Sequence, residues 1–411
     1  MSKKTFVIVG ASLAGAKAAG ELRERGFDGR VVLIGSESER PYERPPLTKD
    51  YLQGKSERQG AYVHDDGFYD EQAIELRLGT TAESIDTGSS TVTLAGGESL
   101  SYDALLLTTG AHPRALSVPG ADLDGVHYLR TFADCDALRE RLAAGSGRVA
   151  VVGAGWIGSE FAASARGAGL DVTVIDPLML PNERIFGTEI GTFYRDVHVS
   201  HGVEMILGEG VDALEGDGSV SAVRTSDGRR VECDFAVVGV GVIPRTGLAG
   251  AVGLTVENGI QVDAACKTSA ANVFAAGDVA NAWHPFYERH IRVEHWANAL
   301  NQGPAAARSM LGDAVSYDRI PYFFSDQYDV GMEYSGYAVE WDEVVIRGDY
   351  EGGEFIAFWL TGGRVVGGMN VNVWDVNEHV QTLIRSRRQV DTNALRDPDT
   401  PLESLAGQPA G

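Results

Sequence analysis

The sequence predicts an α/β fold with two parallel-sheet domains of the same kind and a smaller α+β domain at the C-terminal end. Two glycine-rich turns carry this prediction, GASLAG from Gly10 to Gly15 and GAGWIG from Gly153 to Gly158, because each follows an apolar β-branched run and opens an alanine-rich helical stretch. From about Asp318, aromatic residues alternate with polar ones, which favours antiparallel strands. The repeated strand, turn and helix indicate a duplicated domain whose second copy is inserted in the first.

The composition is typical of a globular chain. With 411 residues, 44% of them hydrophobic, the chain is long enough for about three domains with substantial cores. No apolar stretch approaches the roughly 20 residues that span a bilayer, and the N-terminus shows no signal-peptide pattern, so we expect a cytoplasmic protein. A formal charge of −23 argues against binding to nucleic acid or to an anionic membrane.

The apolar pattern places the elements of both parallel-sheet domains. The first should contain strands at 5–10, 30–35, 105–108 and 273–276 and a helix at 14–25. The second should contain a strand from Arg148, strands at 172–175 and 235–240, and a helix at 159–167. We therefore assign residues 1–112 and 239–316 to the first domain, 113–238 to the second and 317–411 to the third. The last dozen residues, rich in Pro, Gly and Ala, are expected to fray.

The first turn is a degenerate dinucleotide-binding motif. Backbone N–H groups at a helix N-terminus can hold a pyrophosphate, but the middle glycine of the motif is Ser12 here, so a simple tight turn is the alternative interpretation. Glu37 lies about 22 residues beyond Gly15, at the end of the second strand, where a carboxylate can accept hydrogen bonds from ribose hydroxyls. Asp278 follows another strand of the same sheet and suits polyol or phosphate contacts.

The second turn matches the full G-x-G-x-x-G motif between a strand and a helix, which predicts a second bound nucleotide. Asp176 ends the next strand, where a carboxylate would bind an adenosine 2′-hydroxyl and repel a 2′-phosphate. The nearest cation is Arg184, and no basic residue follows Asp176 directly. These features favour NADH over NADPH.

Several motifs together resemble a known family. GASLAG, TTGAHPR at 108–114 and AAGDVA at 275–280 resemble the FAD-dependent pyridine-nucleotide oxidoreductases of the glutathione-reductase fold. PYERPPLTK at 41–49 and two further segments resemble the NADH-dependent ferredoxin reductases of cytochrome monooxygenases and Rieske dioxygenases; these segments are RVEHW at 292–296 and FFSDQYD at 323–329. The resemblance implies two Rossmann-like dinucleotide-binding domains, with the NAD domain inserted in the FAD domain, plus a small α+β C-terminal domain.

The motifs and the resemblance together assign the site residues. The predicted FAD contacts are Gly10, Ser12, Ala14, Gly15, Glu37, Arg44, Lys49, Ala82, Gly110, Arg130, Asp278 and Trp296. The predicted NAD contacts are Gly153, Gly155, Ile157, Gly158, Glu160, Asp176, Arg184 and Gly241. Lys49, Glu160 and Trp296 are the predicted catalytic residues, since the resemblance implies a Lys49–Glu160 ion pair beside the flavin N5 atom. The alternatives are two ordinary surface charges and a packing tryptophan.

The lack of a cysteine pair in one segment determines which electron acceptor we expect. Disulfide reductases of this fold carry a C-x-x-x-x-C pair where this chain has the segment 44–49, RPPLTK. Cys135, Cys233 and Cys266 lie far apart, without disulfide or metal spacing, and are expected to be buried or neutral thiols. The resemblance therefore implies hydride transfer from NADH to FAD and single-electron transfer to an iron–sulfur ferredoxin that feeds an oxygenase. The alternatives are a rubredoxin reductase, a flavin NADH oxidase, or a signalling flavoprotein like apoptosis-inducing factor.

The expected partner raises a question of charge, because ferredoxins are usually acidic and this chain is acidic too. A local basic patch could still guide docking. The densest basic cluster is Arg385, Arg387 and Arg388, and three further arginines lie near the predicted flavin-edge segment: Arg289, Arg292 and Arg308. A solvated helix face is the alternative interpretation of the cluster. The protein itself is expected to be a monomer or a homodimer with no metal site.

Overall fold

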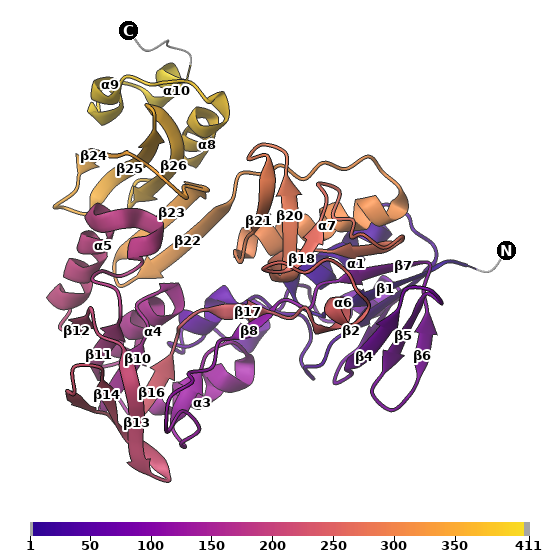
Figure 1. The fold of residues 1–411 in the computed structure, drawn as a ribbon, viewed down its shortest axis with the longest axis horizontal. Coiled ribbons are helices and arrows are strands. Elements are labelled where there is room, and N and C mark those ends of the chain that lie inside the picture. Colours follow the sequence, from indigo (N-terminus) through magenta and orange to yellow (C-terminus); the bar gives the residue numbers. More distant parts are fainter. Residues whose placement is uncertain (1–2, 407–411) are drawn as a thin grey trace. The chain divides into compact units, whose positions relative to one another are not determined.

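The computed structural model describes residues 3–406, which divide into two compact units (Figure 1). Unit 1 comprises the described residues up to Arg44, Arg58–His112 and Ile243–Pro321. Unit 2 comprises Pro45–Glu57, Pro113–Val242 and the described residues from Tyr322 on. The chain passes from one unit to the other within two short strands, β8 (Ala111–Pro113) and β17 (Val242–Pro244), and also after Arg44, Glu57 and Pro321.

A five-stranded parallel sheet forms the centre of unit 1. Its strands, in the order β19-β7-β1-β2-β3, are Val273–Ala275, Ala104–Leu107, Thr5–Val9, Arg30–Ile34 and Ile74–Arg77. Phe6 and Ile8 of β1 are buried in the same cluster as apolar residues of helices α1 (Leu13–Glu24) and α7 (Trp296–Leu311), which pack together. Because side chains alternate along a strand, Val7 and Val9 join a separate cluster on the opposite face.

Smaller elements complete unit 1. The second cluster includes residues of an antiparallel sheet and of a further sheet with a short helix. These elements are β4 (Ala82–Asp86), β5 (Thr91–Leu94) and β6 (Ser99–Ser101), then β18 (Ile260–Val262), β20 (Ala280–His284), β21 (Arg289–Arg292) and α6 (Gly247–Ala251). Three short helical segments lie in the connections: η2 (Arg58–Ala61), α2 (Phe68–Glu71) and η3 (Gly277–Val279).

Unit 2 repeats the architecture of unit 1. Its parallel sheet, in the order β12-β11-β10-β16-β9, consists of Glu204–Leu207, Asp171–Asp176, Arg148–Val152, Phe235–Val238 and Val126–Tyr128. An antiparallel sheet shares a buried cluster with it and consists of β13 (Val211–Asp217), β14 (Ser219–Thr225) and β15 (Arg230–Glu232). The helices are η1 (Pro45–Thr48), α3 (Phe132–Leu142), α4 (Trp156–Gly167) and α5 (Glu183–Ser200).

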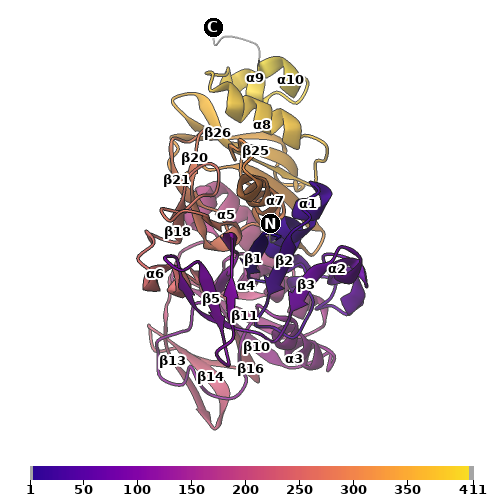
Figure 2. The ribbon, with the colours of Figure 1, turned by 90° about the vertical axis from the view of Figure 1, so that its right-hand side faces the viewer.

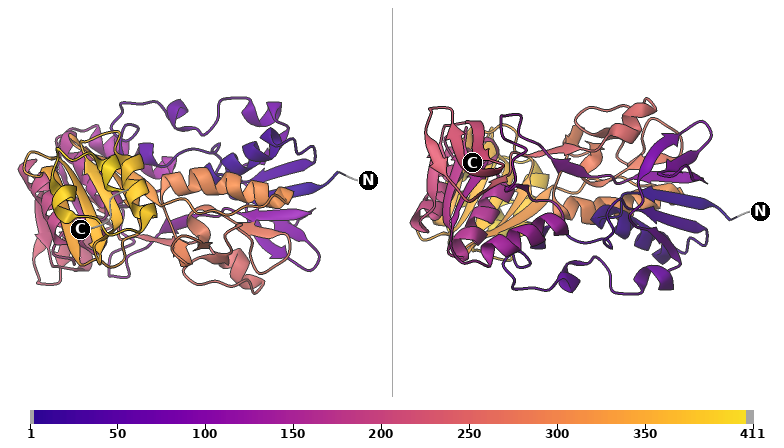
Figure 3. Two further views of the ribbon diagram at one scale, coloured as in Figure 1. Left: turned by 90° about the horizontal axis from the view of Figure 1, so that it is seen from above. Right: turned by 90° about the horizontal axis from the view of Figure 1, so that it is seen from below.

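A five-stranded antiparallel sheet forms the rest of unit 2. Its order is β22-β23-β26-β25-β24, with bounds Tyr322–Gln327, Val330–Gly336, Arg364–Val371, Glu354–Thr361 and Glu343–Asp349. Helices α8 (Asn377–Ser386), α9 (Thr392–Arg396) and α10 (Leu402–Leu405) lie beside it (Figures 2 and 3). Its aromatic side chains share a buried cluster with α5, and the Trp359 indole donates to the Phe186 carbonyl oxygen at 3.0 Å.

The structure confirms the predicted fold class. Four strands of each parallel sheet have the same order, β3-β2-β1-β7 and β12-β11-β10-β16, which agrees with the predicted duplication, whereas the fifth strand comes last along the chain in one sheet (β19) and first in the other (β9). The aromatic region forms the expected antiparallel sheet. Helix α4 begins at Trp156, three residues before the predicted start, because the glycine turn itself initiates it. The expectation of a frayed tail is wrong for Leu402–Leu405, a helical turn whose two leucines are buried, and residues 407–411 lie outside the described part. The four-segment domain division stays a prediction.

Candidate functional site

The first glycines of the two turns have the same backbone geometry. Gly10 and Gly153 follow the middle strands of their sheets and adopt φ angles of +124° and +105°, which residues with side chains rarely adopt. A Cβ atom on Gly10 would lie 2.0 Å from the carbonyl oxygen of Thr108, and one on Gly153 would lie 2.5 Å from that of Gly239. Packing within the protein therefore requires glycine at both positions.

The last glycines are equivalent too, whereas the middle positions differ. A Cβ atom on Gly15 would lie 2.1 Å from the carbonyl oxygen of the first glycine of its turn, and one on Gly158 would lie 1.9 Å from its counterpart. A Cβ atom on Gly155 would meet only a carbonyl oxygen at 3.9 Å, an ordinary contact. Packing does not require glycine there, but close approach of a pyrophosphate does. The middle position of the second turn therefore fits a bound dinucleotide.

Both turns lead into helix N-termini whose N–H groups are not capped by side chains. Ser12 is the N-cap of α1 and Gly155 is the N-cap of α4, and neither makes a side-chain capping hydrogen bond. The first N–H groups of a helix have no partner within the helix, and the helix dipole adds positive potential there. Both helix starts can therefore bind phosphate oxygens. This donor set and the two glycine cradles fit the FAD and NADH implied by the sequence.

Glu37 presents an ionised carboxylate beyond the end of β2. Its two oxygens accept hydrogen bonds from the Tyr42 hydroxyl at 2.5 Å and from Arg44 Nη2 at 3.0 Å. Burial alone would raise the pKa of Glu37, but Arg44 and Tyr42 outweigh it, and the pKa lies below its usual range. The side chain is 38% exposed, so the carboxylate can still accept hydrogen bonds from ribose hydroxyls.

Arg44, Asp278 and His295 lie in the same part of unit 1. Burial disfavours the charge of Arg44, but its neighbours, among them Glu37 and Asp278, raise the pKa of the guanidinium. Burial lowers the pKa of His295 to about 4, an effect that Asp278 partly opposes, so the imidazole is neutral at physiological pH. The structure thus brings together Glu37, Arg44 and Asp278, which were predicted from separate motifs.

Sequence reasoning missed residues that position this part of unit 1. Gln302 Oε1 accepts a hydrogen bond from the N–H of Gly277 at 2.8 Å, and Asn298 Nδ2 donates to the same oxygen at 3.3 Å. The carboxyl of Glu43, whose pKa is raised by burial, lies beside the indole of Trp296. The sequence signal that could have identified Asn298 and Gln302 is that they are polar residues at buried positions of α7. They fix the turn that carries Asp278.

Asp176 has a second role that its position in the sequence does not reveal. It ends β11 as expected, but its side chain is largely buried and accepts two backbone hydrogen bonds. Oδ2 accepts from the N–H of Ala154 at 2.6 Å and Oδ1 accepts from that of Leu178 at 2.8 Å. Each oxygen keeps a further lone pair for a ribose hydroxyl. Asp176 therefore fixes the glycine turn, and its contact with the nucleotide stays a prediction.

The other predicted NAD contacts lie around the same edge of unit 2. Ile157, in the first turn of α4, is 40% exposed. Arg184 is exposed in the first turn of α5. Gly241 has a φ angle of +97° and open space where a Cβ atom would lie. These residues are accessible to a ligand, as a transient substrate requires.

Lys49 and Glu160 form the predicted ion pair within unit 2. Pro45 and Pro46 start the helical turn η1, which places Lys49 directly after it. Lys49 Nζ donates to Glu160 Oε1 at 2.6 Å, and the two side chains are only 14% and 6% exposed. The alternative of two ordinary surface charges is therefore wrong.

Two further donors converge on the Glu160 carboxylate. Ser325 Oγ donates to Oε1 at 2.7 Å and Thr48 Oγ1 donates to Oε2 at 2.5 Å. Gln327 Nε2 in turn donates to Ser325 Oγ at 3.2 Å. Two segments of unit 2, Thr48–Lys49 and strand β22, thus fix one carboxylate of α4. This arrangement holds its orientation, as expected for a group that positions a cofactor or substrate.

The network continues to a buried histidine. Gln327 Oε1 can only accept, so His198 Nε2 donates to it at 2.9 Å, and His198 Nδ1 accepts from the Tyr328 hydroxyl at 3.0 Å. Burial lowers the pKa of His198 to about 4, which keeps the imidazole neutral and fixes this tautomer. Sequence reasoning missed His198 and Gln327.

A cavity of about 580 Å³ reaches Lys49 from within unit 2. It is lined by residues of the segment 49–55 that follows η1, by the C-terminal ends of α3 and α4, and by Asp326 of β22. Burial raises the pKa of Asp326, while Lys49 opposes this effect and Glu160 adds to it. The cavity gives water or a small ligand access to the Lys49 side of the ion pair.

The remaining predicted residues are spread over the two units. Unit 1 holds Ala82, the first residue of β4, and Gly110, which has a φ angle of +65°. Unit 2 holds Arg130, a half-buried residue that follows β9, together with Lys49, whereas the other predicted flavin contacts belong to unit 1. All of these roles stay predictions.

Two of the basic residues proposed for docking form ion pairs with acidic residues of unit 1. Arg292 pairs with Glu294 and Arg308 with Glu21, both within unit 1. Arg385 lies in the last turn of α8, and Arg387 and Arg388 follow it.

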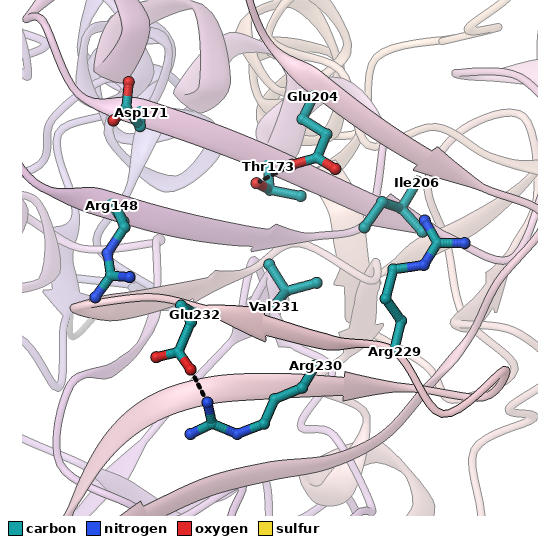
Figure 4. A pocket seen from close by; sticks show the side chains of 9 residues that line it. All are labelled: Arg148, Asp171, Thr173, Glu204, Ile206, Arg229, Arg230, Val231 and Glu232. Atoms are coloured by element: carbon teal, nitrogen blue, oxygen red, sulfur yellow. Dashed lines mark hydrogen bonds and ion pairs between the residues drawn. The ribbon is translucent and has the colours of Figure 1, made fainter.

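A second hollow of unit 2 lies near the N-terminal ends of its parallel strands, whereas the glycine turn follows the C-terminal end of β10 (Figure 4). It has a volume of about 300 Å³ and includes Arg148, Asp171 and Glu204, the first residues of β10, β11 and β12. Arg230 and Glu232 at its rim pair with each other. The mixture of paired charges gives it no clear ligand preference.

The cysteines and the possible metal ligands limit the redox chemistry available to the chain. Within residues 3–406, none of the cysteines forms a disulfide and all three are buried. Burial raises the pKa of Cys233 to about 11 and that of Cys266 to about 12, while Cys135 donates to the Leu47 carbonyl oxygen. The same residues contain no group of three or more His, Cys, Asp or Glu that could hold a metal ion.

None of the helices within residues 3–406 is long and apolar enough to cross a membrane.

Two family models match the chain. Residues 4–303 match the family described as pyridine nucleotide-disulphide oxidoreductase, and residues 322–406 match the family described as reductase C-terminal. The boundary between the matches lies near the start of β22.

Curated relatives and solved structures match over the whole length. The chain is 40% identical to the ferredoxin–NAD(+) reductase component of the anthranilate 1,2-dioxygenase system of Burkholderia cepacia, covering 98% of this chain and 100% of that one. It is 35% identical to putidaredoxin reductase of Pseudomonas putida, covering 97% and 96%. Its structure matches the reductase in a covalent putidaredoxin reductase–putidaredoxin complex with a TM-score of 0.95 and 34% identity, over 99% of this chain and 100% of that one.

Proposed function

We propose that this chain, which belongs to the pyridine nucleotide-disulphide oxidoreductase family, transfers electrons from NADH through FAD to an iron–sulfur ferredoxin that serves an oxygenase. The balanced reaction consumes one NADH and two oxidised ferredoxins and yields NAD+, two reduced ferredoxins and one proton. The buried Lys49–Glu160 pair carries the proposal, because Lys49 ends the segment 44–49 that, by the family resemblance, replaces the cysteine pair of disulfide reductases of the fold.

A bound FAD would supply a hydride acceptor that can also release electrons singly. The protein's task is to align the nicotinamide and to exclude water, since hydride transfer needs no protein acid or base. The second glycine turn would bind the pyrophosphate of NADH, and the exposed residues around it admit and release the substrate. Glu160, fixed by three donors, would hold Lys49 in place beside the flavin.

The cysteine environment supports a one-electron exit. A dithiol relay needs two cysteines in bonding range and at least one reactive thiolate. Within residues 3–406 the cysteines form no disulfide, and the pKa values of Cys233 and Cys266 are raised by burial. The named relatives that match along the whole chain are reductases of ferredoxins or of dioxygenase systems. A cytoplasmic location belongs to this proposal.

Steady-state reduction of cytochrome c by NADH tests the proposal. The FAD-loaded protein is assayed with and without a purified [2Fe–2S] ferredoxin from the same host. We expect the rate to depend strongly on ferredoxin. Equal rates without ferredoxin, together with consumption of oxygen, would instead support an NADH oxidase.

A further inference from the structure

Asn182 lies beside the second glycine turn and is unassigned by any motif. Its backbone N–H donates to the carbonyl oxygen of Ala154, within the turn, at 3.3 Å. It immediately precedes α5, and only 7% of the residue is exposed. Asn182 is therefore a buried polar residue next to the predicted pyrophosphate site.

The Asn182 side chain lacks the partner that its burial requires. Its Nδ2 atom is buried and makes no hydrogen bond within residues 3–406. Asparagine before a helix usually caps it, but this residue has φ and ψ of 52° and 21°, and its side chain makes no capping bond. Buried polar groups in folded proteins nearly always have a partner. The unpaired amide indicates a partner that is absent from the chain itself.

Backbone conformation alone does not account for this residue. Asparagine tolerates a positive φ angle better than most residues, which explains why Asn or Gly can occupy position 182. Glycine would satisfy the same backbone without burying an unpaired amide. The conformation therefore explains the residue type but not the buried amide.

The surrounding loop fixes Asn182 relative to the turn. Leu178 donates to Asp176 and accepts from the N–H of Gly208 at 2.9 Å, so the start of the loop is held to the ends of β11 and β12. The N–H of Phe186 donates to the Asn182 carbonyl oxygen at 3.2 Å, which holds the loop's other end to α5. Because the backbone on both sides of Asn182 is held, little backbone reorganisation is needed for its side chain to bind a ligand.

We propose that the carboxamide of Asn182 binds a phosphate oxygen of the dinucleotide at the second turn, which makes it a substrate-binding residue beyond the glycine motif. A terminal amide supplies two N–H donors, and the backbone of Asn182 is bonded to Ala154 in the turn before α4, whose N-terminus can bind phosphate oxygens. This inference rests on the proposed function only in taking NAD(H) as the substrate.

Asn182→Gly tests the inference, because glycine keeps the backbone conformation and removes only the amide. Calorimetric titration of the FAD-loaded protein measures the dissociation constants of NAD+, ADP-ribose and adenosine. We expect NAD+ and ADP-ribose to bind about tenfold more weakly to the variant, the effect of one hydrogen bond to a charged group. Adenosine, which lacks phosphate, should bind equally to both proteins.

Two further variants complete the test. Asn272→Gly is the matched control, since Asn272 is exposed, lies in unit 1 and has a φ angle of +59°. It should leave all three constants unchanged. Asn182→Asp keeps the side-chain shape and adds a negative charge, so it should weaken ADP-ribose binding more than Asn182→Gly does, and it reports on the site even if the glycine variant unfolds.

The outcomes separate this inference from the proposed function. Unchanged affinity for ADP-ribose in a folded Asn182→Gly or Asn182→Asp protein would overturn the inference while leaving the function intact. Equal weakening of adenosine would also overturn it, because the effect would then not involve phosphate. A wild-type protein that binds neither NAD+ nor ADP-ribose would overturn both.

Discussion

The two glycine turns have similar backbone conformations but different surroundings. In both, the first and last glycines are required by carbonyl oxygens of the protein. The acidic residues that follow differ: Glu37 is 38% exposed and held by side chains, whereas Asp176 is largely buried and held by backbone N–H groups. The middle residue is Ser12 in one turn and Gly155 in the other.

The difference separates the duplicated scaffold from the chemistry added to it. In unit 1, the nucleotide would meet side chains from separate segments, including Arg44 and Asp278, as suits a cofactor that stays bound. In unit 2, most predicted contacts lie on α4 and on the connections that follow β10 and β11, Gly241 follows β16, and several are exposed, as suits a substrate that comes and goes.

Alanine at the last glycine of either turn should have the largest effect. A Cβ atom within 2.1 Å of a carbonyl oxygen forces the turn apart and costs on the order of 3 kcal/mol. Gly15→Ala should lose FAD, whereas Gly158→Ala should keep FAD but be reduced by NADH at least about 100-fold more slowly, a barrier increase of about 2.7 kcal/mol. The ratio of flavin to protein absorbance and stopped-flow reduction measure the two effects.

Gly167→Ala is the control, because a Cβ atom there meets nothing within 4 Å at the end of α4. Its flavin content and reduction rate should equal those of the wild type. A Gly158→Ala protein that is reduced by NADH at the normal rate would remove the distinction between the turns.

Removal of the Glu160 carboxylate should have the next largest effect. Glu160→Ala leaves buried Lys49 without its partner and should destabilise unit 2 by about 3 kcal/mol. Glu160→Gln keeps the shape and should be milder, but should slow flavin reduction at least about tenfold if Lys49 is positioned by the charge. Urea unfolding and stopped-flow reduction give the two numbers.

Ser325→Ala supplies the matched comparison, since it removes one donor and leaves the ion pair. Its effect on flavin reduction should be smaller than that of Glu160→Gln. If Glu160→Gln reduces the flavin as fast as the wild type, the ion pair is only structural.

The Asp176 carboxylate tests whether the buried acid also contacts the nucleotide. Asp176→Asn keeps one oxygen for a backbone N–H but loses the charge, so NAD+ should bind about tenfold more weakly. NADP+ should be affected less, because repulsion of its 2′-phosphate is removed at the same time. An equal loss for both nucleotides would show that Asp176 acts only on the turn.

The smallest effect concerns Glu37 and pH. Its lowered pKa means that the ionised carboxylate stabilises the folded state above the ordinary glutamate range, and that this contribution is lost as pH falls through the lowered value. For a partly exposed pair the contribution is below about 1 kcal/mol. Melting temperatures of wild type and Glu37→Gln should therefore differ at neutral pH and converge in acid, whereas a constant difference would contradict the assignment.

Local patterns predicted more of the molecule than long-range contacts did. The geometry at Gly10, Gly15, Gly153 and Gly158 follows from short segments, which is why the fold class and both turns were recognisable. The partners of Glu160 come from η1 and β22, far apart in sequence, and no periodicity identifies them. The backbone bonds of Asp176 depend on one loop's conformation, which a motif does not specify.

We propose that the protein uses its two nucleotide sites to take one hydride from NADH and to pass the two electrons singly to ferredoxin. The most direct measurement is an anaerobic titration of the FAD-loaded protein with NADH in the presence of excess oxidised ferredoxin. We predict two ferredoxins reduced for each NADH consumed, with no turnover of NADH when ferredoxin is left out. Continued NADH consumption without ferredoxin, or consumption that leaves the added ferredoxin oxidised, would contradict it.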